Sequence, residues 1–348
     1  MSVAERKDSH LTLCLTEAVE LPSHDASGFA ALRFEHDALP EVDLAEVRTD
    51  TELLGKRLAA PIVIGAMTGG TPRAGEMNRR LAVAAARCRV GFALGSQRRM
   101  LQDPGVRDTY AVREAAPDLP LLFGNLGAVQ LNYGVGVPEL RQLVEGVGCD
   151  AFNFHLNALQ EAIQPEGDTR FAALLPKLRA VIPEMGVPVL LKEVGSGLSR
   201  RTAEKIRELP VAGVETGGVG GTSWSKVESL RAADPARRSL GELFARWGIP
   251  TSESIVACRG VLGDRVVIAS GGIRNGIEIA KALALGADAV ALALPFLRAA
   301  EQSIEAVEEE LGRLVAELRL AMFLTGCAGV PELRTRTLSR ARDLTATP

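Results

Sequence analysis

The strongest constraint on the fold is a repeat, in which a short apolar run is followed by a longer helix-forming segment eight times after residue 60. The apolar runs are nearly continuous, and most begin after Pro, Gly or Asp, which is typical of parallel strands buried on both faces. Eight strands alternating with helices predict an α/β protein, specifically a (β/α)8 TIM barrel. The predicted strands are Pro61–Ala66, Val90–Gly95, Pro120–Asn125, Asp150–His155, Pro188–Glu193, Val211–Thr216, Arg265–Ser270 and Ala287–Ala293.

Segments rich in Ala, Leu, Glu and Arg separate these strands and predict the crossover helices. An open doubly wound sheet is the competing topology, but it would be expected to carry a glycine fingerprint after its first strand and usually has fewer units. A long insertion follows the sixth strand, at Gly217–Leu240, and predicts an active-site loop. The predicted helices include Arg73–Arg87, Glu139–Gly146, Thr202–Leu209, Gly276–Leu285 and a last helix at Ile304–Leu324.

We therefore expect one domain that spans residues 1–348. Residues 1–60 are polar and irregular and should form an N-terminal arm and cap, residues 61–325 the barrel, and residues 326–348 a C-terminal tail. The basic residues of this tail are expected to be solvated charges, as charge runs usually are. They are Arg334, Arg336, Arg340 and Arg342.

Composition limits the classes of partner. Hydrophobic residues make up 47% of the 348 residues, enough for a large core, and the formal net charge of -3 gives no global attraction to nucleic acid or anionic lipid. No apolar run is long enough to span a membrane and the first residues form no apolar leader, so we expect a cytoplasmic protein without stable membrane association. The five scattered cysteines, without a CxxC pair, predict reduced packing residues rather than a disulfide framework or a zinc site.

Glycine-rich turns follow the sixth and seventh predicted strands, at Gly217–Thr222 and Gly271–Gly276. In a TIM barrel the chemistry lies at the carboxyl ends of the strands, and the last loops commonly hold phosphate. Backbone N–H groups in such turns can cradle an anion. Either turn alone would more often be a plain tight connection, but together they predict a phosphate site.

Charged and polar side chains also follow the fourth and fifth strands. Lys192 ends an apolar strand and needs an anionic or electron-rich partner, which is either the N1–C2=O edge of a flavin or a structural ion pair with Glu193 or a neighbouring strand. His155, taken alone, is more simply a core histidine. The dense polar run that starts there suits a diphosphate, and its lone carboxylate, Glu161, suits Mg²⁺ that also binds substrate phosphates.

The motifs RKDSH, MTGG, GSQR, NLGAVQLNYG, HLNALQE, QPEGD, KEVG, GGTSW, SGGIR and AMFLTG occur in this order. The chain thereby resembles the type 2 isopentenyl diphosphate isomerases, which are FMN-dependent barrel enzymes, over almost its whole length. HLNxLQE followed by QPEGD is the specific part of the resemblance, whereas GGxR is shared by many FMN barrels. The resemblance implies a reversible allylic proton shift between isopentenyl and dimethylallyl diphosphate, with FMN reduced by NADPH, with Mg²⁺, and in a tetramer or octamer.

The resemblance also implies a role for individual residues. Gln160 would lie beside the reacting carbons, and Glu161 would ligate Mg²⁺. Residues Arg6, Lys7, Arg98, His155, Asn157 and Gln160 would bind the substrate, with the Arg6–Lys7 arm closing over the anion rather than remaining solvated. The FMN-binding set would be Thr68, Ser96, Asn125, Lys192, Thr222, Gly272, Arg274, Ala293 and Leu294.

Removal of an allylic proton normally needs a positioned acid and base. The barrel-mouth motifs contain no strong carboxylate pair, which favours the reduced flavin as the proton carrier. Three positions depart from the family pattern: Ala158 replaces a usual proline, VETGGVGG with Glu215 replaces VAGAGG, and Ser196 replaces a larger apolar residue. These changes are either neutral or mark an altered substrate.

Three other functions compete with this hypothesis. The first is a same-scaffold FMN enzyme that acts on a longer or modified prenyl diphosphate. The second is another FMN-barrel oxidoreductase, such as a 2-hydroxy acid oxidase or an IMP dehydrogenase-like protein, which would need a His/Arg pair near the seventh strand or a Cys in the sixth loop, and neither is present. The third is a non-catalytic flavin or prenyl-diphosphate binding protein.

Overall fold

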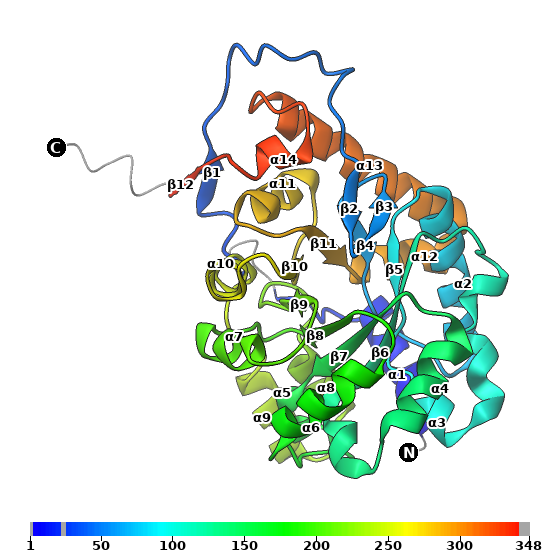
Figure 1. The fold of residues 1–348 in the computed structure, drawn as a ribbon. Helices are drawn as coiled ribbons and strands as arrows, with labels where there is room; N and C mark the ends of the chain where they lie inside the picture. The colour runs from blue at the N-terminus through cyan, green and yellow to red at the C-terminus, as the bar shows by residue number, and fades with distance from the viewer. Residues whose placement is uncertain (1–2, 22–25, 341–348) are drawn as a thin grey trace.

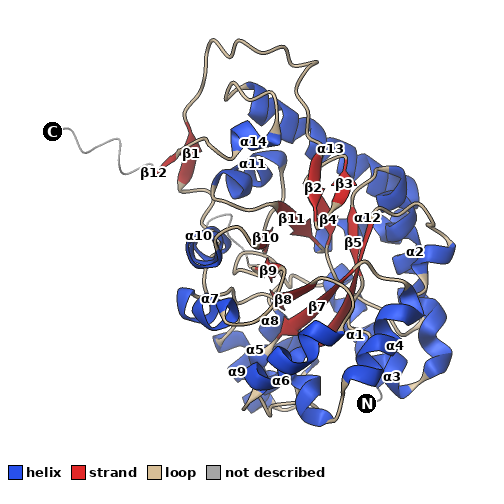
Figure 2. Cartoon of the chain, in the orientation of Figure 1, coloured by secondary structure: helices blue, strands red, loops and turns tan. Residues whose placement is uncertain are grey.

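Eight parallel strands close into a barrel in the computed structural model, which describes residues 3–21 and 26–340. The order around the barrel is β10-β11-β4-β5-β6-β7-β8-β9, so every strand pairs with its neighbours in sequence. Helices surround these strands (Figure 2). The predicted TIM barrel is confirmed. Its strands are β4 (Ile62–Ile64), β5 (Gly91–Ala93), β6 (Leu121–Gly127), β7 (Ala151–Leu156), β8 (Val189–Glu193), β9 (Gly213–Glu215), β10 (Val266–Ser270) and β11 (Ala289–Leu292).

Each predicted strand overlaps an observed one, but most observed strands are shorter. Residues past the ladder, such as Gly65, still bond to the neighbouring strand, since its N–H donates to Leu292 O at 2.7 Å. They then turn out toward the barrel mouth. Apolar composition extends through these ends, so the sequence pattern does not mark where the ladder stops.

The predicted crossover helices are present, with caps that explain their bounds. Helix α2 begins after Thr71, whose hydroxyl accepts the Ala74 N–H, and helix α4 ends at Gly148 with φ +62°. The helices between β4 and the C-terminus are α2 (Pro72–Arg87), α3 (Arg98–Gln102), α4 (Val137–Val147), α5 (Ala158–Ile163), α6 (Leu174–Val181), α7 (Arg200–Arg207), α8 (Trp224–Arg231), α9 (Pro235–Leu243), α10 (Thr251–Leu262), α11 (Gly276–Ala284), α12 (Leu294–Gln302), α13 (Ile304–Phe323) and α14 (Val330–Leu333). Short 3₁₀ turns are η1 (Pro104–Thr109), η2 (Val112–Glu114), η3 (Ala128–Tyr133) and η4 (Ile182–Glu184).

The insertion after β9 contains two helices, α8 and α9, and the crossover helix α10 begins only at Thr251. Ser223 caps α8 by accepting the Lys226 N–H, and Asp234 caps α9 by accepting the Ala236 N–H. The insertion is therefore an ordered helical pair rather than an irregular loop.

The expectation of an irregular N-terminal arm is wrong for its first part, because helix α1 spans Val3–Thr16. Its sequence alternates polar and apolar residues without a clear stripe, so its helical character depends on packing against α8, α2 and α12. After α1, the chain bonds to the insertion: the Ser223 N–H donates to Val19 O at 3.0 Å. In Figure 1, α1 is drawn in dark blue and is partly covered by the barrel strands in this view.

A small hairpin closes the barrel at one end. It consists of β2 (Thr51–Leu53) and β3 (Lys56–Leu58), joined by Leu54 and Gly55, which both have positive φ as a tight two-residue turn requires. Leu53 and Leu58 are 1% exposed and pack into one cluster with the inward side chains of the barrel strands. The hairpin therefore plugs the barrel interior.

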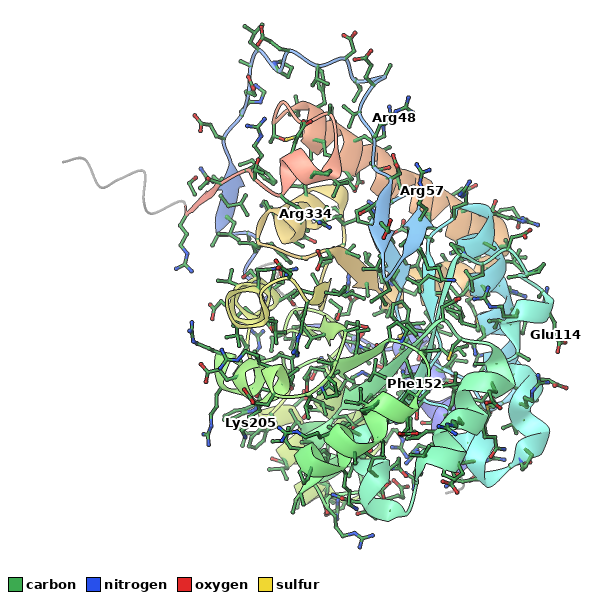
Figure 3. The ribbon with its side chains drawn as sticks, viewed as in Figure 1. Arg48, Arg57, Glu114, Phe152, Lys205 and Arg334 are labelled. Carbon is green, nitrogen blue, oxygen red and sulfur yellow. The ribbon has the colours of Figure 1, made fainter. Side chains whose placement is uncertain are left out.

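The C-terminal segment is not simply solvated. Strand β12 (Leu338–Arg340) pairs antiparallel with β1 (Leu32–Phe34). Arg334, labelled in Figure 3, donates to Asp288 O at 2.9 Å, and Arg336 donates to Gly326 O at 2.9 Å. The expectation of a solvated charge is thus wrong for Arg334, which is half-buried, whereas Arg336 stays exposed. Arg340 lies in β12, and Arg342 lies outside the described residues.

The five cysteines are free thiols, and all except the half-buried Cys88 are buried, as expected for packing residues. Burial raises the pKa of Cys14 and of Cys149 to about 12. No helix among the described residues is both long and apolar enough to cross a membrane.

Leu53→Ala should remove the plug side chain and leave a cavity in the barrel. We expect a loss of about 2–5 kcal/mol in the free energy of unfolding, measured by denaturant titration. Leu39→Ala is the matched control, because Leu39 is 75% exposed and its truncation should change the stability by less than about 0.5 kcal/mol. Equal effects of the two substitutions would contradict the plug.

Candidate active site

One cavity lies at the carboxyl ends of the barrel strands and is lined by the loops after them together with α1. Every site residue predicted from the sequence lines it. These residues are Arg6, Lys7, Thr68, Ser96, Arg98, Asn125, His155, Asn157, Gln160, Glu161, Lys192, Thr222, Gly272, Arg274, Ala293 and Leu294. Their proximity is an observation, whereas their roles toward a ligand remain predictions.

The two glycine-rich loops pack on each other. Gly271 and Gly272 have φ of +110° and +75°, and a Cβ on either would collide with the backbone of Gly218 or Gly220. The Thr251 hydroxyl donates to Gly271 O at 2.6 Å and fixes this contact. Glycine is thus required for the loops to meet, and their union forms one wall of the cavity.

Arg274 at this wall contacts a residue that sequence reasoning missed. Its Nε donates to Glu20 at 2.9 Å, and Arg298 donates to the same carboxylate at 3.0 Å. Burial raises the pKa of Glu20, but the two guanidinium groups outweigh it and lower the pKa overall. Glu20 therefore stays ionised. Its hydrogen bond with Arg274 holds the segment after α1 against the glycine-rich turn Gly271–Gly276.

Lys192 forms the structural ion pair that was one of its two predicted alternatives. Its Nζ lies 2.7 Å from Glu215 Oε1 on the neighbouring strand β9, and it also donates to Glu193 O at 3.0 Å. The Glu193 carboxylate does not contact Lys192. It accepts the N–H groups of the following loop at 2.5–3.1 Å, namely Val194, Gly195, Ser196 and Gly197.

His155 is held in one tautomer. Asn125 Nδ2 donates to Leu94 O at 2.9 Å, so its Oδ1 faces the ring as an acceptor, 2.8 Å from His155 Nδ1. The imidazole proton therefore lies on Nδ1. Burial lowers the pKa of His155 to about 3, and the nearby positive charges of Lys192 and Lys7 add to this effect. The ring is neutral near pH 7.

The α5 end of the site concentrates polar groups. Asn157 Nδ2 donates to Glu161 at 2.9 Å, and the Asp168 N–H donates to the other Glu161 oxygen at 2.7 Å. Burial raises the pKa of Glu161, and these two hydrogen bonds oppose the rise. Asn157 Oδ1 and Arg6 Nε are buried without a hydrogen-bond partner, which is costly unless a polar ligand completes them.

Arg98 forms an ion pair with Asp168, which also accepts a hydrogen bond from Gln130 Nε2 at 2.8 Å. Asp168 and Gln130 were not among the predicted site residues. Both residues lie in motifs quoted above, Asp168 in QPEGD and Gln130 in GAVQ. The motifs could therefore have pointed to them, but the sequence could not indicate that Asp168 binds Arg98.

Helix α1 brings Lys7 over the cavity. Lys7 Nζ donates to Ser96 O at 2.8 Å and to the Tyr110 hydroxyl at 2.6 Å, and that hydroxyl donates to Ser96 O at 2.9 Å. Burial lowers the pKa of Lys7 to about 7, helped by the charges of Arg6 and Arg99. An anionic ligand would stabilise the ammonium form.

A buried network joins α1 to α8 beside Gln160. Glu228 is fully buried, lies 2.8 Å from His10 Nε2, accepts Gln160 Nε2 at 3.2 Å and pairs with Arg231. Burial lowers the pKa of His10, although Glu228 opposes this. His10 was missed as a site residue, although its spacing of three from Lys7 places both on one face of a helix.

No group of three or more His, Cys, Asp or Glu side chains could hold a metal ion among residues 3–21 and 26–340. A divalent cation at Glu161 would therefore need phosphate oxygens and water to complete its ligands. This arrangement is typical of Mg²⁺, which often keeps one or two protein carboxylates beside substrate phosphates.

Comparison with known proteins assigns the family. The isopentenyl-diphosphate delta-isomerase of Synechococcus sp. is 49% identical over 333 residues, covering 96% of this chain and 95% of the relative. The protein of the same name from Rickettsia bellii is 45% identical over 334 residues, covering 96% and 97%. The chain belongs to the FMN-dependent isopentenyl-diphosphate delta-isomerase family. The resemblance drawn from the motifs is confirmed.

Two further comparisons relate this isomerase-family chain to flavin barrels. A family model described as FMN-dependent dehydrogenase matches residues 154–340. A solved structure of mandelate oxidase with 3,3-difluoro-2-hydroxy-3-phenylpropionic acid has a TM-score of 0.64 at 20% identity and covers 97% of this chain and 99% of that one. At this identity the structural likeness shows the fold alone.

Tyr110→Phe should loosen α1, because it removes the hydroxyl between Lys7 and Ser96. A net loss of about 1 kcal/mol predicts roughly fivefold faster amide exchange in α1, measured by hydrogen–deuterium exchange with mass spectrometry. Tyr133→Phe is the control, since Tyr133 is 36% exposed and lies away from the arm on η3. Unchanged exchange in α1 would rule out this anchor.

His155 should remain a neutral Nδ1–H imidazole from pH 8 down to pH 5. Nitrogen-15 NMR can test this, and the His155→Gln variant assigns the His155 signal by its loss. The unfolded chain binds this proton near pH 6.5, whereas the folded pKa is about 3. The contribution of His155 to stability therefore falls as the pH drops from about 6.5 toward 3. An imidazolium signal at pH 6 would refute the assignment.

Proposed function

We propose that the protein interconverts isopentenyl diphosphate and dimethylallyl diphosphate with reduced FMN and Mg²⁺, in isoprenoid biosynthesis. The observation that carries this proposal is that one cavity joins Lys192 and the two glycine loops to the polar cluster from His155 to Glu161. The residues proposed to hold the flavin and those proposed to hold the diphosphate thus line one cavity. Membership of the isomerase family supports the same activity.

The flavin half fits FMN by its donor set. Lys192 supplies an ammonium for the ring edge that becomes negative on reduction. Arg274 supplies a positive charge for the phosphate, and the two glycine-rich loops supply backbone N–H groups that a phosphate can approach closely. Thr68, Ser96, Asn125, Thr222, Gly272 and the Ala293–Leu294 backbone would complete the contacts. When bound and reduced by NADPH, the flavin supplies the acid and base that the isomerisation needs.

The diphosphate half supplies positive charge and unsatisfied polar atoms. Arg6, Lys7 and Arg98 would bind the phosphates, and the buried atoms Asn157 Oδ1 and Arg6 Nε, which have no partner, would gain one. His155 offers only an acceptor while it is neutral, so it must take up a proton to donate to a phosphate. Glu161 would hold Mg²⁺ with phosphate oxygens and water.

Gln160 is the residue proposed to act at the reacting carbons. Its Nε2 is held by Glu228 at 3.2 Å, so the amide is oriented before any substrate arrives. Because the Glu228 carboxylate also binds His10 and Arg231, its own acceptor capacity is largely used. The protein therefore contributes orientation and electrostatics to the proton shift.

We also propose a cytoplasmic homo-oligomer, a tetramer or octamer, that binds neither nucleic acid nor membranes stably. Exposed apolar side chains on and just after α9 support self-association, because Leu243 is 77% and Trp247 64% exposed.

The decisive test is an anaerobic incubation of the purified protein with FMN, NADPH, Mg²⁺ and isopentenyl diphosphate in D₂O, followed by NMR. We expect deuterated dimethylallyl diphosphate that disappears when the reductant or Mg²⁺ is omitted. Bound FMN without product would overturn the isomerase proposal and point to a longer or modified prenyl diphosphate as the substrate.

Gln160→Ala should lower kcat by about 10²-fold or more and change KM little, because the proposed interaction acts on the transition state more than on binding. Steady-state kinetics on the FMN-loaded protein would measure both constants. Gln302→Ala is the control, since Gln302 is exposed on α12 and its loss should leave both unchanged. A change in KM alone would contradict the role of Gln160.

A further inference from the structure

Three ionisable side chains form a row at one level of the barrel mouth. In the strand register, His155 on β7 is paired with Lys192 on β8, and Lys192 is paired with Glu215 on β9. All three line the cavity. Because paired positions of adjacent parallel strands face the same side, the three side chains point into the cavity together and act on the same ligand.

The charges within this row cancel. His155 is neutral, and Lys192 and Glu215 form an ion pair of 2.7 Å in which their side chains are 10% and 3% exposed. Lys7 of α1 is the other cation that acts on His155, and its Nζ donates hydrogen bonds to Ser96 O and to the Tyr110 hydroxyl. Charges buried this deeply are weakly screened by salt, so a nearby ligand senses each of them.

We propose that Glu215 is a tuning residue that offsets the charge of Lys192 toward the bound flavin and thereby limits how strongly the site favours the anionic reduced form. The proposal rests on the proposed placement of FMN beside Lys192.

The charge beside the flavin influences how many protons reduced FMN holds. Reduction of FMN takes up two electrons with either one proton, which gives an anion, or two protons, which gives a neutral ring. An uncompensated ammonium at the ring edge favours the anion, while a carboxylate paired with that ammonium favours retention of the second proton. A reaction that moves protons without net transfer of electrons benefits from a reduced ring that keeps its proton.

A purely structural role would give a different result. If Glu215 only holds Lys192 in place, its replacement by glutamine keeps an oxygen that can accept a hydrogen bond from the ammonium, so the flavin potential would stay unchanged. The potential and the protonation state of the reduced flavin therefore separate the two roles.

The experiment compares wild type with Glu215→Gln, both loaded with FMN, by anaerobic spectroelectrochemistry. We expect reduced FMN to gain about tenfold in binding relative to oxidised FMN, which for a two-electron couple is a midpoint potential about 30 mV more positive. The reduced flavin spectrum should also show loss of its proton at a lower pH, by about tenfold in proton concentration. Glu301→Gln, which removes a carboxylate from the surface pair with Arg73, should match wild type.

An unchanged potential and an unchanged protonation profile in FMN-loaded Glu215→Gln would overturn the proposal. If that variant does not fold or does not hold FMN, Glu215→Ala decides, since it also removes the carboxylate and should shift the potential in the same direction, and no shift would again refute the proposal. The deuterium assay on wild type tests the isomerase separately. A shifted potential without isomerase activity would support the role of Glu215 and reject only the proposed reaction.

Discussion

Closure of the parallel sheet is the constraint on which the rest of the structure depends. Because β10 pairs with β11 and β11 pairs with β4, the carboxyl ends of all eight strands converge on one opening. Side chains from distant parts of the sequence, such as Ser96, His155 and Lys192, thereby share one cavity. The β2–β3 hairpin seals the interior, so this opening is where polar groups can reach solvent and ligand.

Electrostatic compensation organises the cavity once the strands have placed its residues. Most of the charged groups there already have a counterpart: Lys192 has Glu215, Arg98 has Asp168, and Arg274 has Glu20. Burying an unpaired charge is costly, so these pairs keep the cavity stable before a ligand arrives. Two buried polar atoms without a hydrogen-bond partner, Asn157 Oδ1 and Arg6 Nε, lie at the end of the cavity proposed to bind the diphosphate.

The barrel and the composition of its mouth could be predicted from the sequence because they depend on local patterns. Continuous apolar runs predict buried strands, and in a barrel the residues after each strand must meet. The sequence could not indicate the partners that long-range packing selects. Helix α1 lacks a clear apolar stripe, and Tyr110, Glu20 and Glu228 join the site through contacts with residues more than 60 positions away. Such contacts leave no periodic signal in a single chain.

The contact of Glu20 with Arg274 would also make the wall proposed to bind the FMN phosphate selective. A carboxylate that the fold of the same chain holds beside Arg274 competes at an effective concentration of about millimolar or higher. A small free anion that offers a single contact must displace this internal competitor without compensation. A larger ligand, whose other parts bind elsewhere in the cavity, can displace Glu20 and still gain free energy, so the wall favours phosphates attached to a larger molecule over phosphate itself.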